Sequence, residues 1–233
     1  MVLSKKAINK LPGWLDQIQV LVWDLDGTLY QEIPELRKEI QSHTVDLIRQ
    51  VKKVSKREAE RIFSQMYQKL GSSTQTLIDC GVDRLYALSG EWYAEIQLRY
   101  LRRDQDLQTM FERLQNKRHI LNTNSINFAA QKKLKRLGLN DRIFEKLFTN
   151  ADMFGVLKPD PKPFLAVLEY TKLPAAVHLF IGDREKTDLE PAKALGMRTC
   201  LVWGESTLAD ISLSTVYEVA QLFDQMINQN VVG

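Results

Sequence analysis

Asp24 and Asp26 stand two residues apart directly after the apolar run of residues 20–23, and Gly27 and Thr28 follow them. A short apolar run that ends at a glycine turn predicts a buried strand, so both acids are expected at its carboxyl end. A carboxylate in that place can serve as a nucleophile or as a general acid and base. Two acids before a Gly-Thr pair also suit a turn with a helix cap, so this segment alone does not define a site.

Three later segments carry complementary chemistry, and each of them follows an apolar run. They are Thr123 with Asn124, Lys158 before Pro159, and Asp183 with Asp188. Hydroxyl and amide groups can donate hydrogen bonds to a phosphate, and an ammonium group can neutralise its charge. Paired carboxylates offer the hard oxygen ligands that Mg²⁺ prefers. Four such segments in a consistent order are not expected by chance.

The four motifs resemble those of the haloacid dehalogenase-like hydrolase superfamily over nearly the whole chain. The resemblance implies that Asp24 attacks phosphorus and that Asp26 protonates the leaving alcohol and then activates water. It also implies two ligand sets: Thr123, Asn124 and Lys158 for the phosphate, and Asp24, Asp183, Asp188 and the backbone carbonyl of Asp26 for Mg²⁺. A cation is needed because a dianionic phosphate is otherwise repelled by the carboxylates.

The elements that must position these residues alternate between strand and helix. Apolar runs at 119–121, 146–148, 177–181 and 199–203 predict further strands. Between them, residues 126–137 have helical periodicity, and Gly138 is expected as the C-terminal cap. Asp160 and Pro161 are expected to open another helix, and Thr187 with Glu190 has the spacing of a capping box. We therefore predict an α/β fold with a Rossmann-like parallel sheet and ligands at the carboxyl ends of its strands.

Residues 31–117 break this alternation and contain helical patterns without a convincing strand. We predict an inserted α-helical cap there, and a core made of residues 1–30 and 118–233. One helix is expected between Leu36 and Val51, a second ends at Gly71, and a third carries Leu85, Leu88, Trp92 and Ile96. A cap that closes over the site suits a small soluble phosphorylated metabolite.

The composition excludes several classes of protein. With 233 residues, 44% hydrophobic and 26% charged, the chain has the composition of an ordinary globular protein. No apolar stretch approaches the roughly 18 residues of a membrane span, and Lys5 and Lys6 are not followed by a signal-peptide core, so we expect a cytoplasmic protein.

The net charge of +3 gives no reason to expect a nucleic-acid partner, and the basic run 132–136 is expected to be a solvated helix face. Either a monomer or a homodimer is expected.

Several alternatives remain open at this point. The segment 24–30, together with Thr123 and Asn124, is similar to the branch that contains pyrimidine 5′-nucleotidases. A dehalogenase on this fold does not need an acid at position 26, and Asp26 therefore argues against that activity. A phosphomutase would retain all four motifs, as would a binding protein without turnover. We expect Arg184 to pair with a neighbouring acid and the three histidines to have packing or surface roles. The two cysteines, Cys80 and Cys200, are expected to be reduced and buried.

Overall fold

A computed structural model describes residues 12–231 of the chain, with side chains up to Asp224. Lys5 and Lys6, which entered the prediction about a signal peptide, lie outside the described residues. None of the helices that the structure describes has the length and apolar composition needed to cross a bilayer.

The core of the fold is a parallel six-stranded sheet with the order β3-β2-β1-β4-β5-β6. Its strands are β1 (Val20–Trp23), β2 (Arg118–Asn122), β3 (Lys146–Phe148), β4 (His178–Gly182), β5 (Arg198–Val202) and β6 (Ile211–Leu213). Every neighbouring pair is parallel, and β1 pairs with β2 on one side and β4 on the other. The predicted α/β fold with a Rossmann-like parallel sheet is confirmed, and β6 is a strand that the apolar runs did not reveal.

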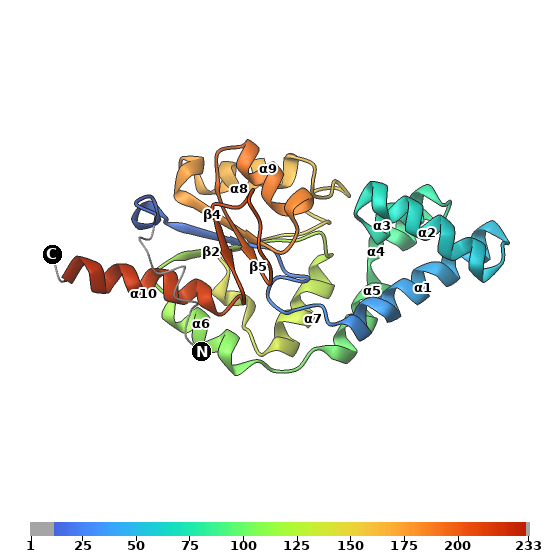
Figure 1. The fold of residues 1–233 in the computed structure, drawn as a ribbon, viewed down its shortest axis with the longest axis horizontal. Coiled ribbons are helices and arrows are strands. Elements are labelled where there is room, and N and C mark those ends of the chain that lie inside the picture. Colours follow the sequence, from blue (N-terminus) through green and yellow to red (C-terminus); the bar gives the residue numbers. More distant parts are fainter. Residues whose placement is uncertain (1–11, 232–233) are drawn as a thin grey trace.

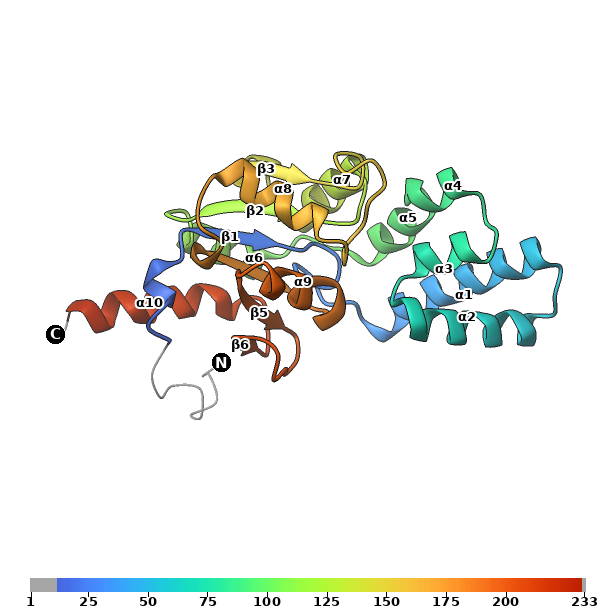
Figure 2. The same ribbon diagram turned by 90° about the horizontal axis from the view of Figure 1, so that it is seen from above.

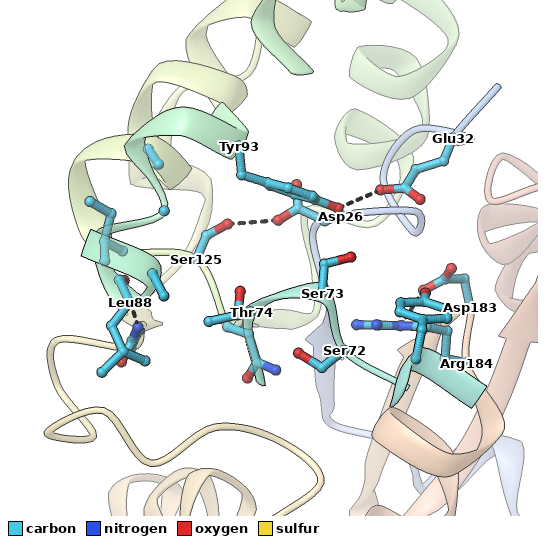
Figure 3. Close-up of a pocket in the computed structure, with 17 residues that line it drawn as sticks. Asp26, Glu32, Ser72, Ser73, Thr74, Leu88, Tyr93, Ser125, Asp183 and Arg184 are labelled. Carbon is cyan, nitrogen blue, oxygen red and sulfur yellow. Dashed lines mark hydrogen bonds and ion pairs between the residues drawn. The ribbon is translucent and has the colours of Figure 1, made fainter. Parts of the chain in front are cut away.

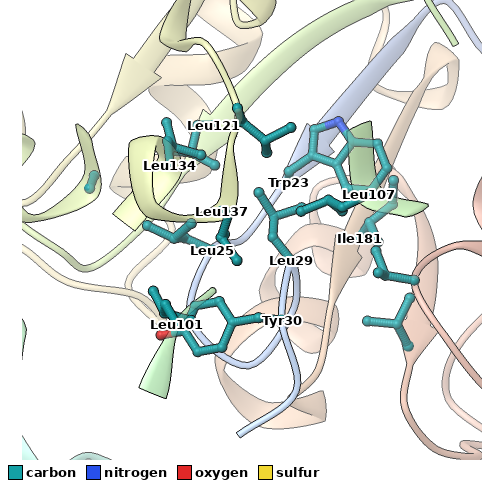
Figure 4. Close-up of a cluster of buried hydrophobic side chains, with 14 of the residues drawn as sticks. Trp23, Leu25, Leu29, Tyr30, Leu101, Leu107, Leu121, Leu134, Leu137 and Ile181 are labelled. Atoms are coloured by element: carbon teal, nitrogen blue, oxygen red, sulfur yellow. The ribbon is translucent and has the colours of Figure 1, made fainter. Parts of the chain in front are cut away.

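Helices cover both faces of this sheet (Figure 1). On one face lie α8 (Lys162–Thr171) and α9 (Glu190–Ala194), and on the other lie α6 (Gln105–Arg113), α7 (Asn127–Leu137) and α10 (Glu218–Val231). Alternate residues of β1 supply the two cores, because side chains along a strand point to opposite faces. Val20 and Val22 pack in the cluster of Phe164, whereas Trp23 joins the cluster on the other face (Figure 4).

The helices after β2 and β3 begin and end near the predicted residues. α7 ends at Gly138, whose φ of 84° is the left-handed conformation that favours glycine at a helix end. α8 has Pro161 as its N-cap residue. The predicted capping box at Thr187 is wrong. Thr187 lies inside a π-helical turn, Glu185–Leu189, and α9 starts at Glu190 without a side-chain cap.

Five helices between β1 and β2 form a separate layer beyond one edge of the core (Figures 1 and 2). They are α1 (Pro34–Lys52), α2 (Lys56–Leu70), α3 (Ser73–Asp79), α4 (Arg84–Ser89) and α5 (Glu91–Tyr100). The first two match the sequence predictions, and α2 ends at Gly71 with a φ of 66°. The single helix predicted through Leu85 and Ile96 is wrong, because Gly90 with a φ of 63° separates α4 from α5. Short 3₁₀ turns occur at Leu15–Gln17, Asp141–Ile143 and Ala175–Val177.

α6 falls within the predicted cap of residues 31–117, but it packs against the sheet. Leu107, Met110 and Phe111 are buried in the core cluster, and the ring of Phe111 lies 5.1 Å from that of Trp23. The packing therefore favours a helical insertion that ends before α6. The division into a core of 1–30 and 118–233 and a cap between them stays a prediction.

The histidines and cysteines are built into the packing, as expected. His119 accepts a hydrogen bond from Trp23 Nε1 at 3.1 Å, and its other ring nitrogen lies 3.0 Å from the carbonyl oxygen of Leu114. His178 is fully buried, and Cys80 and Cys200 are buried free thiols. Burial raises the pKa of both thiols, which keeps them protonated and unreactive.

Phe164 tests the core between the sheet and α8, because its side chain is fully buried and packs 5.0 Å from the ring of Phe180. We expect Phe164→Ala to lower the free energy of unfolding by about 3–5 kcal/mol through lost burial and the cavity left behind. Phe154→Ala is the matched control, since Phe154 is 89% exposed, and it should change stability by less than about 0.5 kcal/mol. Urea denaturation followed by tryptophan fluorescence measures both, and equal losses would contradict this account of the core.

Candidate active site

Three carboxylates meet at the carboxyl edge of the two central strands. Asp24 follows β1, while Asp183 and Asp188 follow β4, which is the direct neighbour of β1. Parallel strands end at the same edge of a sheet, so segments about 160 residues apart in sequence are brought together there. Ligand oxygens of these three residues lie within 4.8 Å of one another. An all-oxygen set of this size fits a hard divalent cation.

The loop after Asp24 is shaped to admit this cluster. Gly27 has a φ of 89°, and a Cβ at this position would overlap the carboxylate of Asp183. Thr28 Oγ1 donates to Asp24 Oδ2 at 3.0 Å, and it lies 3.4 Å from Asp183 Oδ1. Trp203 also holds the loop in place, because its Nε1 donates a hydrogen bond to the backbone carbonyl of Thr28 at 2.9 Å.

Lys158 is the cation that the structure places within the cluster. Its ammonium group is buried and lies 2.8 Å from Asp24 Oδ1 and 2.7 Å from Asp188 Oδ1. Asn124 holds the backbone of Lys158 through both of its amide atoms, at 2.8 and 3.0 Å. Thr123, the residue before Asn124, is also buried, and its hydroxyl accepts a hydrogen bond from the backbone N–H of Ser125 at 3.1 Å. The side chain of Asn124 therefore positions the lysine predicted to bind phosphate.

The carboxylates of this cluster are largely buried and repel one another, and both effects oppose the ionisation of Asp24 and Asp183. Burial, followed by the carboxylates around it, raises the pKa of Asp183 well above its usual range despite Arg184. Burial also raises the pKa of Asp24. For Lys158, burial alone would lower the pKa, but the carboxylates of Asp188 and Asp24 outweigh it and raise the pKa. A bound divalent cation would relieve this repulsion, so the donor set fits a metal both in its chemistry and in its charge.

Asp26 has a separate cation, Lys133, which the sequence analysis placed on a solvated helix face. That expectation is wrong for Lys133, because its side chain is fully buried and its Nζ lies 2.7 Å from Asp26 Oδ1. Burial would raise the pKa of Asp26, but Lys133 and the hydroxyls of Ser125 and Tyr30 outweigh it and lower the pKa. The signal was available in the sequence, since Lys133 stands three residues after Ala130 and four before Leu137 on the apolar face of the helix.

A cavity of about 120 Å³ lies between the acidic edge and the helical insertion (Figure 3). From the core side, Asp26, Asn124, Asp183 and Arg184 line it. From the insertion, it is lined by Ser72, Ser73, Thr74 and Tyr93, among others. Tyr93 donates to Glu32 at 2.9 Å across the cavity wall. The lining is rich in hydroxyl, amide and charged groups, and so it suits a small polar ligand.

Arg184 also enters this cavity, and Figure 3 shows its guanidinium pointing inward. It was expected to pair with a neighbouring acid, and its Nε does lie 3.8 Å from Asp183 Oδ1. That separation is too long for a hydrogen bond, and the buried Nε has no hydrogen-bond partner among the described residues. Arg184 can therefore donate hydrogen bonds to a ligand in the cavity.

The structure thus brings Asp24, Lys158, Asp183 and Asp188 into one cluster, with Asp26 and Asn124 at the adjoining cavity. Their catalytic and ligand roles stay predictions, as do those of Thr123 and of the backbone carbonyl of Asp26. Sequence reasoning missed Lys133 and the residues that hold Asp26 and Thr28 in place, namely Tyr30, Gln97, Ser125 and Trp203.

The fold and this cluster agree with the comparison to known families. The family model described as haloacid dehalogenase-like hydrolase matches residues 21–202. That span covers most of the chain and includes all four predicted motifs. The chain belongs to the haloacid dehalogenase-like hydrolase family, and the predicted resemblance is confirmed at that level; the nucleotidase branch stays untested.

Individual relatives are more distant. A phosphoglycolate phosphatase of Aquifex aeolicus (strain VF5) is 31% identical over 110 residues, which are 45% of this chain and 50% of the relative. The chain thus matches about half the length of that curated relative. Among solved structures, a HAD phosphatase from Thermococcus onnurineus has a TM-score of 0.65 and 24% identity, covering 88% of this chain and 98% of its own.

A 2-haloacid dehalogenase from Pseudomonas syringae pv. Tomato DC3000 is also similar in structure, with a TM-score of 0.56 and 21% identity. The similarity covers 90% of this chain and 99% of the dehalogenase. Proteins whose names give different reactions therefore share this fold, and the fold alone does not define the reaction.

A comparison of Gly27 with Gly71 separates the effect of a left-handed backbone conformation from the effect of close contact with Asp183. Both have positive φ, but only a Cβ at Gly27 would meet Asp183, whereas nothing lies within 4 Å of one at Gly71. We expect Gly27→Ala and Gly71→Ala each to cost about 1–2 kcal/mol of stability from the left-handed conformation. Only Gly27→Ala should also weaken Mg²⁺ binding, by at least about tenfold, because Asp183 must move. Calorimetric Mg²⁺ titrations check this, and equal affinities in the two variants would contradict it.

Proposed function

We propose that the chain is a phosphatase that hydrolyses a small phosphate monoester, with Asp24 as the phosphate-accepting nucleophile and Mg²⁺ as cofactor. One observation gives this proposal its main support. Asp24 lies beside a buried ammonium group and two further carboxylates, while an acid two residues later lines the adjoining cavity. This arrangement supplies a nucleophile, charge neutralisation and a proton-transfer group within one site.

In the first step, Asp24 attacks the phosphorus atom in line with the ester oxygen. Thr28 and Lys158 already hold its two oxygens, at 3.0 and 2.8 Å, so the carboxylate is oriented before the substrate arrives. A held nucleophile removes much of the entropic cost of the reaction. The ammonium group of Lys158 is close enough to Asp24 to neutralise charge that develops on the transferring phosphoryl group.

Asp26 is the group that we assign to proton transfer. It would protonate the ester oxygen as the alcohol leaves and then take a proton from the water that attacks the aspartyl-phosphate. Burial opposes ionisation, but pairing with Lys133 outweighs it and lowers the pKa of Asp26, so the site favours the ionised form that accepts the proton of the water. The side chain of Asp26 lines the cavity in which the leaving group would lie. The two acids therefore divide the chemistry between bond formation to phosphorus and proton movement.

Asp24, Asp183 and Asp188 would hold the Mg²⁺, and the backbone carbonyl of Asp26 is a further proposed ligand. When bound, the ion neutralises carboxylate charge and polarises the phosphoryl group. The close spacing of the three carboxylates and the raised pKa values of Asp24 and Asp183 support a cation there.

The substrate that fits this site is a small phosphorylated metabolite. The cavity of about 120 Å³ is well below the 300–1,000 Å³ of typical drug-sized sites. Its hydroxyl and amide lining favours a polar leaving group, and the guanidinium of Arg184 is available to an anionic one. The relative named as a phosphoglycolate phosphatase makes phosphoglycolate the first compound to assay.

Asp26 favours a phosphatase over a dehalogenase, because halide departure does not need a proton donor at that position. A phosphomutase would return phosphate to a second hydroxyl, so it would convert a hexose phosphate without releasing inorganic phosphate. A binding protein would take up Mg²⁺ and release no phosphate from any ester. Assays of phosphate release and of hexose phosphate isomers separate the three.

Metal removal gives the most direct test of the proposed function. We expect purified protein with Mg²⁺ to release phosphate from p-nitrophenyl phosphate, and excess EDTA to lower the rate by at least about a hundredfold, since the carboxylates then repel the substrate. Added Mg²⁺ should restore the rate. Turnover that is unchanged in EDTA would contradict the metal's role, and no turnover across nucleotides, sugar phosphates and phosphoglycolate would contradict the phosphatase.

Variants of the two acids test their separate roles. Asp24→Asn should lower kcat by at least about a thousandfold, because the amide cannot form the covalent intermediate. Asp26→Asn should lower kcat by about 100- to 10,000-fold, the usual contribution of proton transfer. Circular dichroism should show both variants folded. Rates like those of the unsubstituted protein in either variant would contradict the role of that residue.

A further inference from the structure

Lys133 is a buried charge that the reaction scheme above does not use. On α7 its neighbours Lys132, Lys135 and Arg136 are exposed, whereas the side chain of Lys133 is fully buried. Burying an ammonium group costs several kcal/mol unless partners compensate for the lost water. The partners of Lys133 therefore define what it does.

The ammonium group of Lys133 donates hydrogen bonds to two side chains. Nζ lies 2.7 and 2.8 Å from the two oxygens of Asp26 and 2.8 Å from Ser125 Oγ. An ammonium group has three N–H donors, so these three bonds leave none for a ligand. The ring of Tyr93 covers it at 5.6 Å. Lys133 is also not among the residues that line the cavity, so it can act on a substrate only through other residues.

The Asp26 carboxylate accepts hydrogen bonds from three further side chains besides Lys133. Tyr30 and Gln97 also donate to Oδ1, at 2.5 and 3.1 Å, and Ser125 donates to Oδ2 at 2.6 Å. With Lys133, five hydrogen bonds reach an acceptor that has about four lone-pair sites. Of these donors, only Lys133 bonds both oxygens and so fixes the plane of the carboxylate.

We propose that Lys133 is a positioning residue that fixes the plane of the Asp26 carboxylate at the wall of the cavity in which the leaving group would lie. The inference rests on the proposed function, in which Asp26 exchanges a proton with the leaving-group oxygen. A buried ion pair is weak evidence for stability, because replacing both partners with apolar groups is often neutral. It does fix geometry, and a misplacement of about 1 Å at a reacting group can cost a hundredfold in rate.

Two esters with different leaving groups test this positioning. The ratio kcat/KM reports the steps up to departure of the alcohol, so later hydrolysis of the aspartyl-phosphate does not affect it. Glycerol 2-phosphate releases a basic alkoxide that needs a proton, whereas p-nitrophenyl phosphate releases a stable phenolate. We expect Lys133→Met to lower kcat/KM by about a hundredfold or more for the alkyl ester and by less than about tenfold for the aryl ester.

Lys132→Met is the matched control, since it removes an exposed ammonium group from the adjacent position of α7. It should leave kcat/KM for both esters within about threefold of the unsubstituted protein, as expected for a surface charge away from the site. Equal losses for the two esters in Lys133→Met would overturn the positioning role. Such a result would mean that Lys133 supports the site in general and not Asp26 in particular.

A double-variant comparison tests whether Lys133 acts only through Asp26, even if Lys133→Met does not fold. The pair Asp26→Asn and Lys133→Met removes both charges, so no buried charge is left unpaired. If Lys133 acts only through Asp26, this double variant should match Asp26→Asn within about threefold in kcat/KM for the alkyl ester, because effects within one unit are not additive. A further loss of about a hundredfold would overturn the inference.

Failure of the inference and failure of the proposed function give different results. If the unsubstituted protein releases phosphate from neither of these esters and from none of the nucleotides, sugar phosphates and phosphoglycolate, the proposed phosphatase fails. If it hydrolyses both esters and Lys133→Met does not discriminate between them, the phosphatase stands and the role of Lys133 fails.

Discussion

Negative charge concentrated at the carboxyl edge of the sheet is the constraint on which the site depends. Asp24 and Asp26 come from the same strand end, and Asp183 and Asp188 from the neighbouring one. Each of the first two meets its own buried ammonium group, Lys158 or Lys133, at 2.7 to 2.8 Å. Without these lysines the carboxylates would be uncompensated charges in a poorly solvated place, which is strongly unfavourable.

The two lysines leave the acids in different electrostatic states. Lys158 is shared between Asp24 and Asp188, and Asp183 stands close by, so this cluster still has charge for a divalent cation to neutralise. Lys133 serves Asp26 alone, with hydroxyl groups that complete its hydrogen bonding. The same strand end thus presents one carboxylate that shares its cation with a cluster of acids and another that is paired separately.

The helical insertion contributes directly to the surroundings of Asp26. α5 packs against α7, and Gln97 of α5 donates to the Asp26 carboxylate at 3.1 Å. Tyr93, from the same helix, lies over Lys133 and bonds Glu32. Any movement of the insertion would therefore alter the contacts of Asp26 as well as the cavity. Similarity to a dehalogenase in fold does not extend this arrangement to that protein, because the arrangement depends on particular side chains.

The sequence by itself determined five of the six strands that the structure describes, several of the helices and the cluster of Asp24, Lys158, Asp183 and Asp188. Short apolar runs and motif residues at their ends are local features, and parallel strands bring such ends to one edge. Tertiary structure decided the rest. α6 joins the core and Lys133 turns inward to Asp26, because both outcomes depend on packing between segments far apart in the chain. The left-handed conformation of Gly90 divides a helix that apolar periodicity predicted to be continuous. The spacing of apolar residues along α7 indicates which lysine of the basic run is buried, but the neighbouring elements decide that this lysine meets the Asp26 carboxylate.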